Sequence, residues 1–136
     1  MIEQVTTQTF SKLAADYCAF LEDHCAYSAK QFTAQCTTFL TAINRAIPEL
    51  PEVRVADVTN PDPGPTQWIT RNVAEKLGDE SSNVDTLSGD LTQIYRYLKP
   101  GLLIFSTDSA SAVAYWKSHF AKDCRANLER AQLELD

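Results

Sequence analysis

The sequence has little of several features that other protein classes require. Its four glycines are few for a β-rich fold with many tight turns. No run of residues approaches the ~18 apolar residues of a membrane-spanning helix. Residues 1–12 have neither the basic start nor the apolar stretch of a secretory signal. These absences predict a cytoplasmic protein without a membrane span.

The chain also lacks basic clusters and the motifs of common enzyme families. Its 12 Lys and Arg are scattered and its net charge is −6. Nucleic-acid binding is therefore not expected, because it relies on clustered basic residues that neutralise phosphates. No phosphate-binding glycine loop, serine-nucleophile elbow or HExxH zinc motif is present. We expect no catalytic residue, no cofactor and no bound metal. The missing motifs therefore favour a protein that is not an enzyme.

Cysteine spacing also argues against a zinc site or a disulfide framework. The four cysteines form no C-x-x-C pair. Three of them fall in phase with apolar neighbours, which predicts buried, reduced thiols; these are Cys18, Cys36 and Cys124.

The strongest pattern in the chain is an apolar stripe within residues 86–105. Six apolar residues recur at spacings of three and four, as on the buried side of a helix; they are Leu87, Leu91, Ile94, Leu98, Leu102 and Phe105. Pro100 interrupts this stretch, but the apolar phase continues beyond it. We predict one helix kinked near Pro100, with a break into two segments as the alternative.

Four further amphipathic helices are expected, which gives an all-α, single-domain bundle of about five helices over residues 1–136. The predicted helices cover residues 7–25, a stretch from a Ser28 capping box to Pro48, residues 66–78, and a last helix from an Asp108 cap to Leu135. Phe20 lies off the inner stripe of the first helix, and we interpret it as widening the buried face. A long Pro-rich loop is expected over residues 48–65, and a polar loop over residues 79–85.

Two runs of the sequence resemble a known family. The run SGDLTQIYRYLKPGL (residues 88–102), followed by YWKSHFAKDCRANL (residues 115–128), resembles a bacterial family catalogued as domain of unknown function 5063. Its members open with a helix like DYCAFL at residues 16–21. The chain departs from the family pattern at Pro100, where a helix former is usual, and at Asp123, where a histidine is frequent. The resemblance implies a small, acidic, all-helical bacterial protein, and it implies no activity.

His119 and Asp123 form the first candidate site. They stand four residues apart and share a helix face, as a metal site or a proton-transfer pair requires. Further ligands would have to come from Asp90, or from Glu22 with His24. We favour the simpler interpretation, in which a partly exposed histidine pairs with a surface carboxylate or packs at the core edge.

The helix over residues 86–105 carries the second group of candidates. Asp90 and Tyr97 lie seven residues apart on one flank, and Tyr95 and Lys99 lie four apart on the other. A buried Asp90–Tyr97 hydrogen bond is the favoured interpretation, because buried polar groups need partners. Alternatively, these side chains line a cleft for a ligand or peptide.

The sequence favours a non-catalytic protein-interaction module. Its partner would be an unknown protein or a second copy of the chain, bound through an apolar patch that includes Phe20 or Trp68. The alternative is a metal- or small-molecule-binding bundle that uses a cluster of His119, Asp123 and Asp90.

Overall fold

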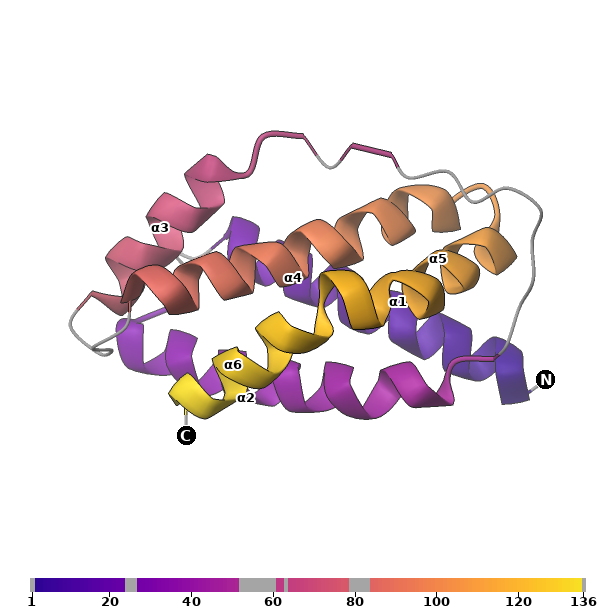
Figure 1. The fold of residues 1–136 in the computed structure, drawn as a ribbon, viewed down its shortest axis with the longest axis horizontal. Coiled ribbons are helices and arrows are strands. Elements are labelled where there is room, and N and C mark those ends of the chain that lie inside the picture. Colours follow the sequence, from indigo (N-terminus) through magenta and orange to yellow (C-terminus); the bar gives the residue numbers. More distant parts are fainter. Residues whose placement is uncertain (1, 24–26, 52–60, 63, 79–83, 136) are drawn as a thin grey trace.

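The computed structural model is an all-α bundle, as expected, with six helices and one short 3-10 helix among the residues it describes (Figure 1). The structure describes residues 2–23, 27–51, 61–62, 64–78 and 84–135, with side chains from Thr7 onward, and this part of the chain contains no strand. The elements are α1 (Ile2–Glu22), α2 (Ala29–Ala46), η2 (Ile47–Glu49), α3 (Gln67–Leu77), α4 (Val84–Phe105), α5 (Ser109–Asp123) and α6 (Arg125–Leu135).

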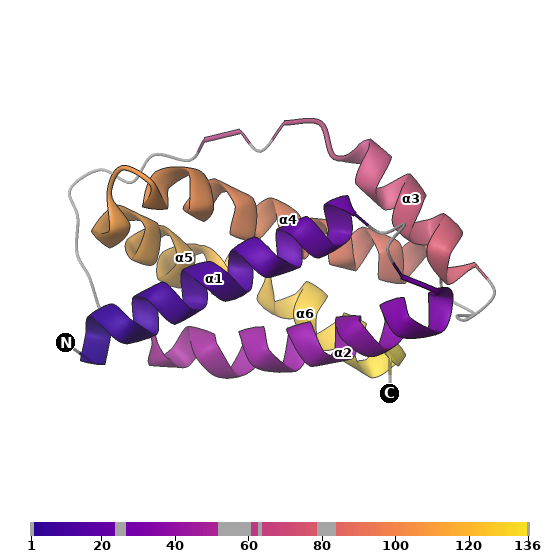
Figure 2. The same ribbon diagram turned by 180° about the vertical axis from the view of Figure 1, so that it is seen from behind.

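Helix α4 lies at the centre of the bundle and packs against α1, α3, α5 and α6. Figure 2 shows α1 and α2 in front, with α4 and α5 behind them. Helix α6 contacts α2, α4 and α5, so it joins the two layers. Helix α3 covers the end of α4 that is opposite α5 (Figure 1).

Side-chain caps fix where two of the helices begin. The Ser28 hydroxyl accepts a hydrogen bond from the Gln31 amide at 3.2 Å, and the Gln31 side chain accepts one from the Ser28 amide at 3.0 Å. This is the predicted capping box. Asp108 caps α5 by accepting from the Ser111 amide at 3.2 Å, also as predicted.

The bounds of the first two helices differ from the predicted ones. Helix α1 begins at Ile2 rather than Thr7, and residues 2–6 contain no glycine or proline that would end a helix. It ends at Glu22 rather than Cys25. Pro48 follows α2 inside η2, where the early position tolerates proline. Most of the two predicted loops, at 52–60, 63 and 79–83, lies outside the described residues, as do His24 and Cys25.

The core is formed by the apolar faces of all six helices. Leu87, Leu91, Ile94 and Leu98 of α4 are buried, and Leu102 and Phe105 pack against them. Phe20 is also buried, so the prediction that it widens the inner face of α1 is confirmed. Its ring stacks on that of Phe32, with centroids 4.6 Å apart. The three predicted buried cysteines are buried and free.

Helix α4 continues through Pro100, so the prediction of one helix rather than two is confirmed. The residue after the proline explains the close packing here. A Cβ atom on Gly101 would lie 2.0 Å from Nε1 of Trp116, which is far inside contact distance. The Trp116 indole is fully buried, and its Nε1 donates to the Leu98 carbonyl at 3.3 Å. Only glycine at position 101 leaves room for this ring.

The prediction of one continuous last helix is wrong. Helix α5 ends at Asp123 and α6 begins at Arg125, with Cys124 between them at φ −137° and ψ −38°. The side-chain amide of Gln93 donates to the Asp123 carbonyl at 3.1 Å, which satisfies an acceptor at the break. Since α6 contacts α2 as well as α4, the change of direction closes the bundle.

Two glycines of α4 allow a matched test of the Trp116 contact. We expect Gly101→Ala to lower the free energy of unfolding by about 3 kcal/mol, since overpacking displaces the indole. Gly89→Ala, with no heavy atom within 4 Å of the added Cβ, is expected to raise it by about 0.5–1 kcal/mol through helix propensity. Urea denaturation measures both, and an equal response of the two variants would contradict the contact.

The buried thiols predict that the fold loses stability at high pH. Burial raises the pKa of Cys18 and of Cys124 from 9.0 to about 12. Above pH 9 the unfolded chain therefore releases protons that the folded chain retains. The free energy of unfolding is thus fully present below pH 9 and falls between pH 9 and 12, by about 1.4 kcal/mol per pH unit for each thiol.

Urea denaturation between pH 8 and 10.5 measures this slope. A Cys18→Ala variant is the control: it is expected to be less stable at pH 8 but to have a shallower pH dependence. A wild-type stability that does not change over this range would contradict the assignment.

Candidate functional site

Asp90 binds side chains of α6 in an almost fully buried setting. Its side chain is 3% exposed and accepts hydrogen bonds from Nε of Arg130 at 2.8 Å, from Nη2 of Arg130 at 2.6 Å and from the Asn127 amide at 2.9 Å. The two bonds from Arg130 make a bidentate salt bridge with the buried carboxylate. Asp90 therefore fixes α6 on α4, and the predicted Asp90–Tyr97 hydrogen bond is wrong.

Tyr97 has a different partner from the one predicted. Its hydroxyl donates to the backbone carbonyl of Trp116 on α5. Burial raises the pKa of this phenol, so it stays protonated as the donor. The two polar groups that the sequence placed on one flank of α4 thus join α4 to two different helices.

Tyr95 and Lys99 do lie together, as their spacing predicted, and they meet at Glu22 of α1. The Tyr95 hydroxyl donates to Oε2 of Glu22 at 2.6 Å, and Nζ of Lys99 lies 3.4 Å from the same oxygen. The ammonium also lies 5.9 Å from the Tyr95 ring centroid. Burial and the bond to Glu22 raise the pKa of Tyr95. The cluster holds α1 against α4, and all three groups have partners.

His119 and Asp123 lie on α5 but do not form a pair. His119 Nδ1 lies 3.1 Å from the Tyr115 carbonyl and 3.1 Å from the Ser118 hydroxyl. Its ring stacks on the Tyr115 ring with centroids 4.5 Å apart. The expectation that this ring packs at the core edge is confirmed. The expected His–carboxylate bond is not found in the described structure.

The residues of the metal-binding alternative do not converge in the described part of the chain. No group of three or more His, Cys, Asp or Glu side chains there is placed to hold a metal ion. Asp90 is saturated by Asn127 and Arg130, while His119 bonds to its own helix. His24, a further candidate ligand, lies outside the described residues.

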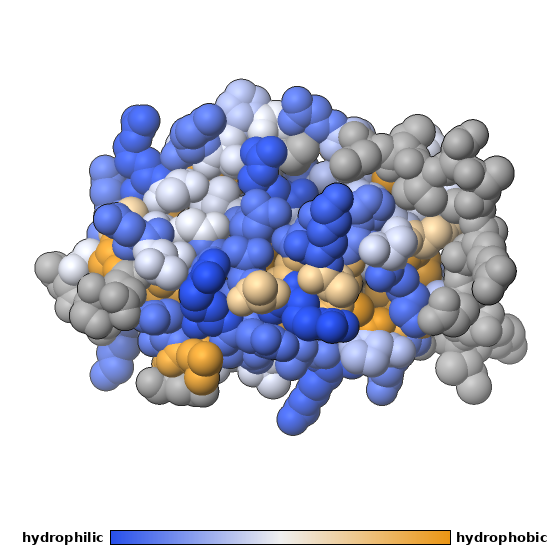
Figure 3. Space-filling view, in the orientation of Figure 1, coloured by the Kyte–Doolittle hydropathy of each residue, from blue (hydrophilic) through white to orange (hydrophobic). Residues whose placement is uncertain are grey.

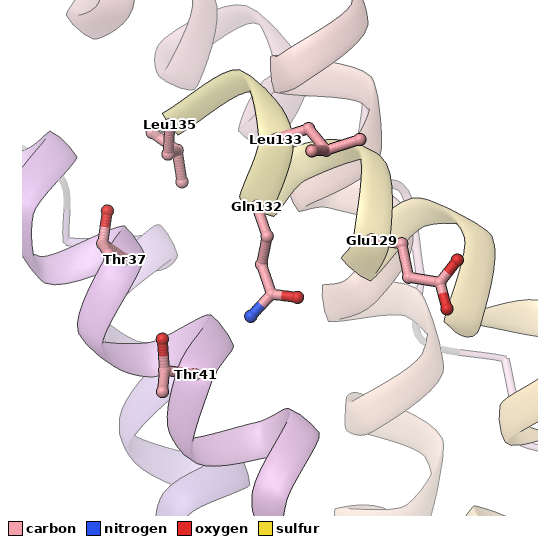
Figure 4. A pocket seen from close by; sticks show the side chains of 6 residues that line it. All are labelled: Thr37, Thr41, Glu129, Gln132, Leu133 and Leu135. Atoms are coloured by element: carbon pink, nitrogen blue, oxygen red, sulfur yellow. The ribbon is translucent and has the colours of Figure 1, made fainter.

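The described part of the chain has several surface hollows that offer places for a ligand or partner, including one of about 420 Å³ on α3 and α4 that is lined by Arg71 and Asp85 among others. The first of three further hollows, here called the α2–α6 hollow, has a volume of about 450 Å³. Figure 4 shows Thr37 and Thr41 on α2 facing α6, with Gln132 extending from α6 toward them. Leu133 at its margin is 76% exposed. The walls mix hydroxyls, an amide and leucines, and so indicate no ligand class.

The second hollow, the aromatic groove, lies between α1 and α2 and has a volume of about 380 Å³. Its lining residues are Asp16, Ala19, Phe20, Asp23, Tyr27 and Phe39. The Phe20 ring contacts the other two, since its centroid lies 5.0 Å from that of Tyr27 and 5.1 Å from that of Phe39. Two carboxylates therefore border an aromatic floor.

The third hollow, the tyrosine pocket, lies along α4 and α5 and has a volume of about 390 Å³. It brings together two of the predicted site residues, Tyr97 and Asp123. It also contains residues that the sequence did not single out; the remaining lining residues are Pro61, Asp62, Gln93, Arg96, Pro100 and Tyr115. Arg96 and Tyr115 are separated by 19 positions, so no local spacing rule links them.

Among the described residues, the exposed large hydrophobic side chains are Trp68, Leu103 and Leu133. Phe20 is 3% exposed, so it adds little exposed surface to the predicted apolar contact patch. Trp68 is 41% exposed, and its indole donates to the Pro65 carbonyl at 2.9 Å. The face seen in Figure 3 is mostly hydrophilic, with smaller separate hydrophobic areas, one of them beside the end of α6. None of the helices that the structure describes is long and apolar enough to cross a membrane.

The fold is shared with a solved structure. The chain is similar to the crystal structure of protein BF1032 from Bacteroides fragilis, a structural genomics target, with a TM-score of 0.77 and 20% sequence identity. The similarity covers 96% of this chain and 92% of the other. No family model matches the chain, and no curated protein matches it. The likeness supports the fold alone, and the resemblance to domain of unknown function 5063 stays a prediction.

Asp90 offers a test between a structural role and a ligand-binding role. We expect Asp90→Ala to lower the free energy of unfolding by about 2 kcal/mol, because Asn127 and Arg130 lose a charged acceptor. Asp85→Ala, at an exposed carboxylate in the first turn of the same helix, is expected to change it by less than about 1 kcal/mol. Urea denaturation compares them. An Asp90→Ala variant as stable as the wild type would contradict the structural role.

Proposed function

We propose that this protein is a non-catalytic interaction module that binds a positively charged segment of a protein partner in the aromatic groove. The observation that supports this function is the placement of carboxylates around a floor of aromatic rings. A lysine or arginine side chain matches both features, since it pairs with the carboxylates and is attracted to the ring faces.

Among the described residues, neither carboxylate of the groove is held by a buried ion pair, although Nζ of Lys76 donates to the carbonyl of Tyr27, which lines the groove, at 2.6 Å. Asp23 has no hydrogen-bond or ion-pair partner for its side chain among the described residues. Asp16 pairs with Lys12 at 3.2 Å, but both side chains are largely exposed, and such pairs contribute little. Helix α1 has no basic residue of its own in its last turn, and the Lys99 ammonium 3.4 Å from Glu22 neutralises the negative end of its dipole only in part. An incoming cation is therefore favoured over an anion.

The aromatic floor is held in place by the core. Phe20 is buried and packs on Phe32, while Tyr27 and Phe39 are partly exposed beside it. Rings fixed in this way lose little conformational freedom on binding. A cation over an aromatic face at a partly exposed site contributes about 0.5–1 kcal/mol, which fits a weak or transient interaction.

The net charge bears on the identity of the partner. At −6, the chain repels a second copy of itself and attracts a basic partner at long range. A heterologous basic segment is therefore a better occupant than a second copy of this protein. A homodimer formed through another surface stays a prediction, and sedimentation velocity measures it.

Binding of a short basic peptide tests this function. We expect a fluorescein-labelled peptide of alternating glycine and arginine to bind in an anisotropy titration, and a glycine–glutamate peptide of equal length not to bind. Asp23→Lys is expected to weaken binding about fivefold, since one exposed charge pair contributes up to about 1 kcal/mol. Phe39→Leu is expected to weaken it about threefold by removing a ring face.

Glu49→Lys is the matched control, because it makes the same change of charge at an exposed position of η2, outside the groove. We expect it to weaken peptide binding less than twofold. Equal weakening by Asp23→Lys and Glu49→Lys would mean that only the overall charge matters, and the groove would be excluded as the binding site.

A further inference from the structure

The tyrosine pocket contains a buried hydroxyl without a partner. The Tyr115 side chain is 2% exposed, yet its hydroxyl makes no hydrogen bond to any residue that the structure describes. The other deeply buried tyrosine hydroxyls are paired: Tyr17 with the Leu91 carbonyl, Tyr95 with Glu22, and Tyr97 with the Trp116 carbonyl. Because buried polar groups are nearly always satisfied, this exception indicates a group that comes from outside.

The Tyr115 ring is held firmly between two neighbours. It stacks on the Tyr97 ring with centroids 6.1 Å apart, and on the His119 ring with centroids 4.5 Å apart. Burial, together with the charge of Asp123, raises the pKa of this phenol to about 12, so the hydroxyl is protonated at neutral pH. A fixed, neutral hydroxyl thus lies near a carboxylate.

The remaining polar groups of the pocket are mainly acceptors. The Asp123 carboxylate has no hydrogen-bond or ion-pair partner among the described residues. The Gln93 side chain is oriented by its bond to the Asp123 carbonyl, which uses its nitrogen and leaves its oxygen as an acceptor. Arg96, the one cation among the lining residues that the structure describes, donates to the Thr66 hydroxyl at 2.9 Å.

The charge of the lining selects the class of ligand. Asp62 and Asp123 outnumber Arg96, so an anion would meet net repulsion. A bare metal ion is not matched either, since no group of three metal-binding side chains is found in the described structure. An ammonium group has three donors and one positive charge, and it fits an acceptor set of one carboxylate, one amide oxygen and one hydroxyl.

We propose that the tyrosine pocket binds a small primary amine, whose ammonium group is held by Asp123, Gln93 and Tyr115. Its volume of about 390 Å³ lies within the range of small-molecule sites. This site uses α4 and α5, whereas the aromatic groove uses α1 and α2, so the amine site does not depend on the proposed peptide binding.

The first test needs no ligand. Tyr115→Phe removes an unpaired buried hydroxyl, so we expect its Tm to rise by about 2 °C. Tyr97→Phe removes a hydroxyl that is bonded to the Trp116 carbonyl, so its Tm is expected to fall. A lower Tm for Tyr115→Phe would show that its hydroxyl is satisfied in the free protein, and would overturn the proposal.

The second test is calorimetric titration of the wild-type protein with 1,4-diaminobutane, with 1,4-butanediol and succinate as neutral and anionic analogues. We expect only the diamine to bind. Asp123→Asn is expected to weaken it at least tenfold and Tyr115→Phe about fivefold, while Asp85→Asn, outside the pocket, changes it less than twofold. No diamine binding, equal binding in all variants, or preference for succinate would each overturn the proposal.

Discussion

The packing of Trp116 against the backbone of Gly101 is the constraint on which the rest of the bundle depends. The indole occupies the space where any other residue at position 101 would place its Cβ. The indole Nε1 donates to the Leu98 carbonyl, and the backbone carbonyl of Trp116 accepts a hydrogen bond from the Tyr97 hydroxyl. Trp116 thus fixes the position of α5 relative to α4 through both its side chain and its backbone. Phe10 of α1 packs edge-on against the same ring, with centroids 4.8 Å apart, so a third helix depends on it.

The chain turns at Cys124, between α5 and α6. After the turn, α6 stays packed on α4 and also contacts α2. Gln93 satisfies the carbonyl at the turn, and Asp90 then binds α6 through Asn127 and Arg130. One face of α4 therefore supplies the polar groups that fix the direction of both C-terminal helices. These buried groups specify geometry, which is the use that a saturated polar network has in a core.

The sequence predicted the helices well because apolar periodicity and caps are local signals. It missed the break at Cys124 because Phe120, Cys124 and Leu128 keep a spacing of four across it, and no glycine or proline marks the turn. It named Asp90 correctly as a buried polar residue but paired it with Tyr97, since spacing along one helix says nothing about neighbouring helices. Its true partners, Asn127 and Arg130, lie 37 and 40 positions away on α6, so no local spacing rule links them to Asp90.

The polar residues fall into those whose hydrogen bonds hold the fold together and those that are available for binding. Asp90 and Glu22 have their acceptors engaged within the bundle, so a ligand would have to displace a structural bond. Asp123 and Tyr115 lie within one pocket, and neither side-chain oxygen has a partner in the described structure. Keeping an unpaired hydroxyl in a core costs stability that a phenylalanine would not. Proteins keep such a loss of stability at positions that serve binding. For this reason we place the ligand at Tyr115 rather than at Asp90, whose carboxylate is already bound by Asn127 and Arg130.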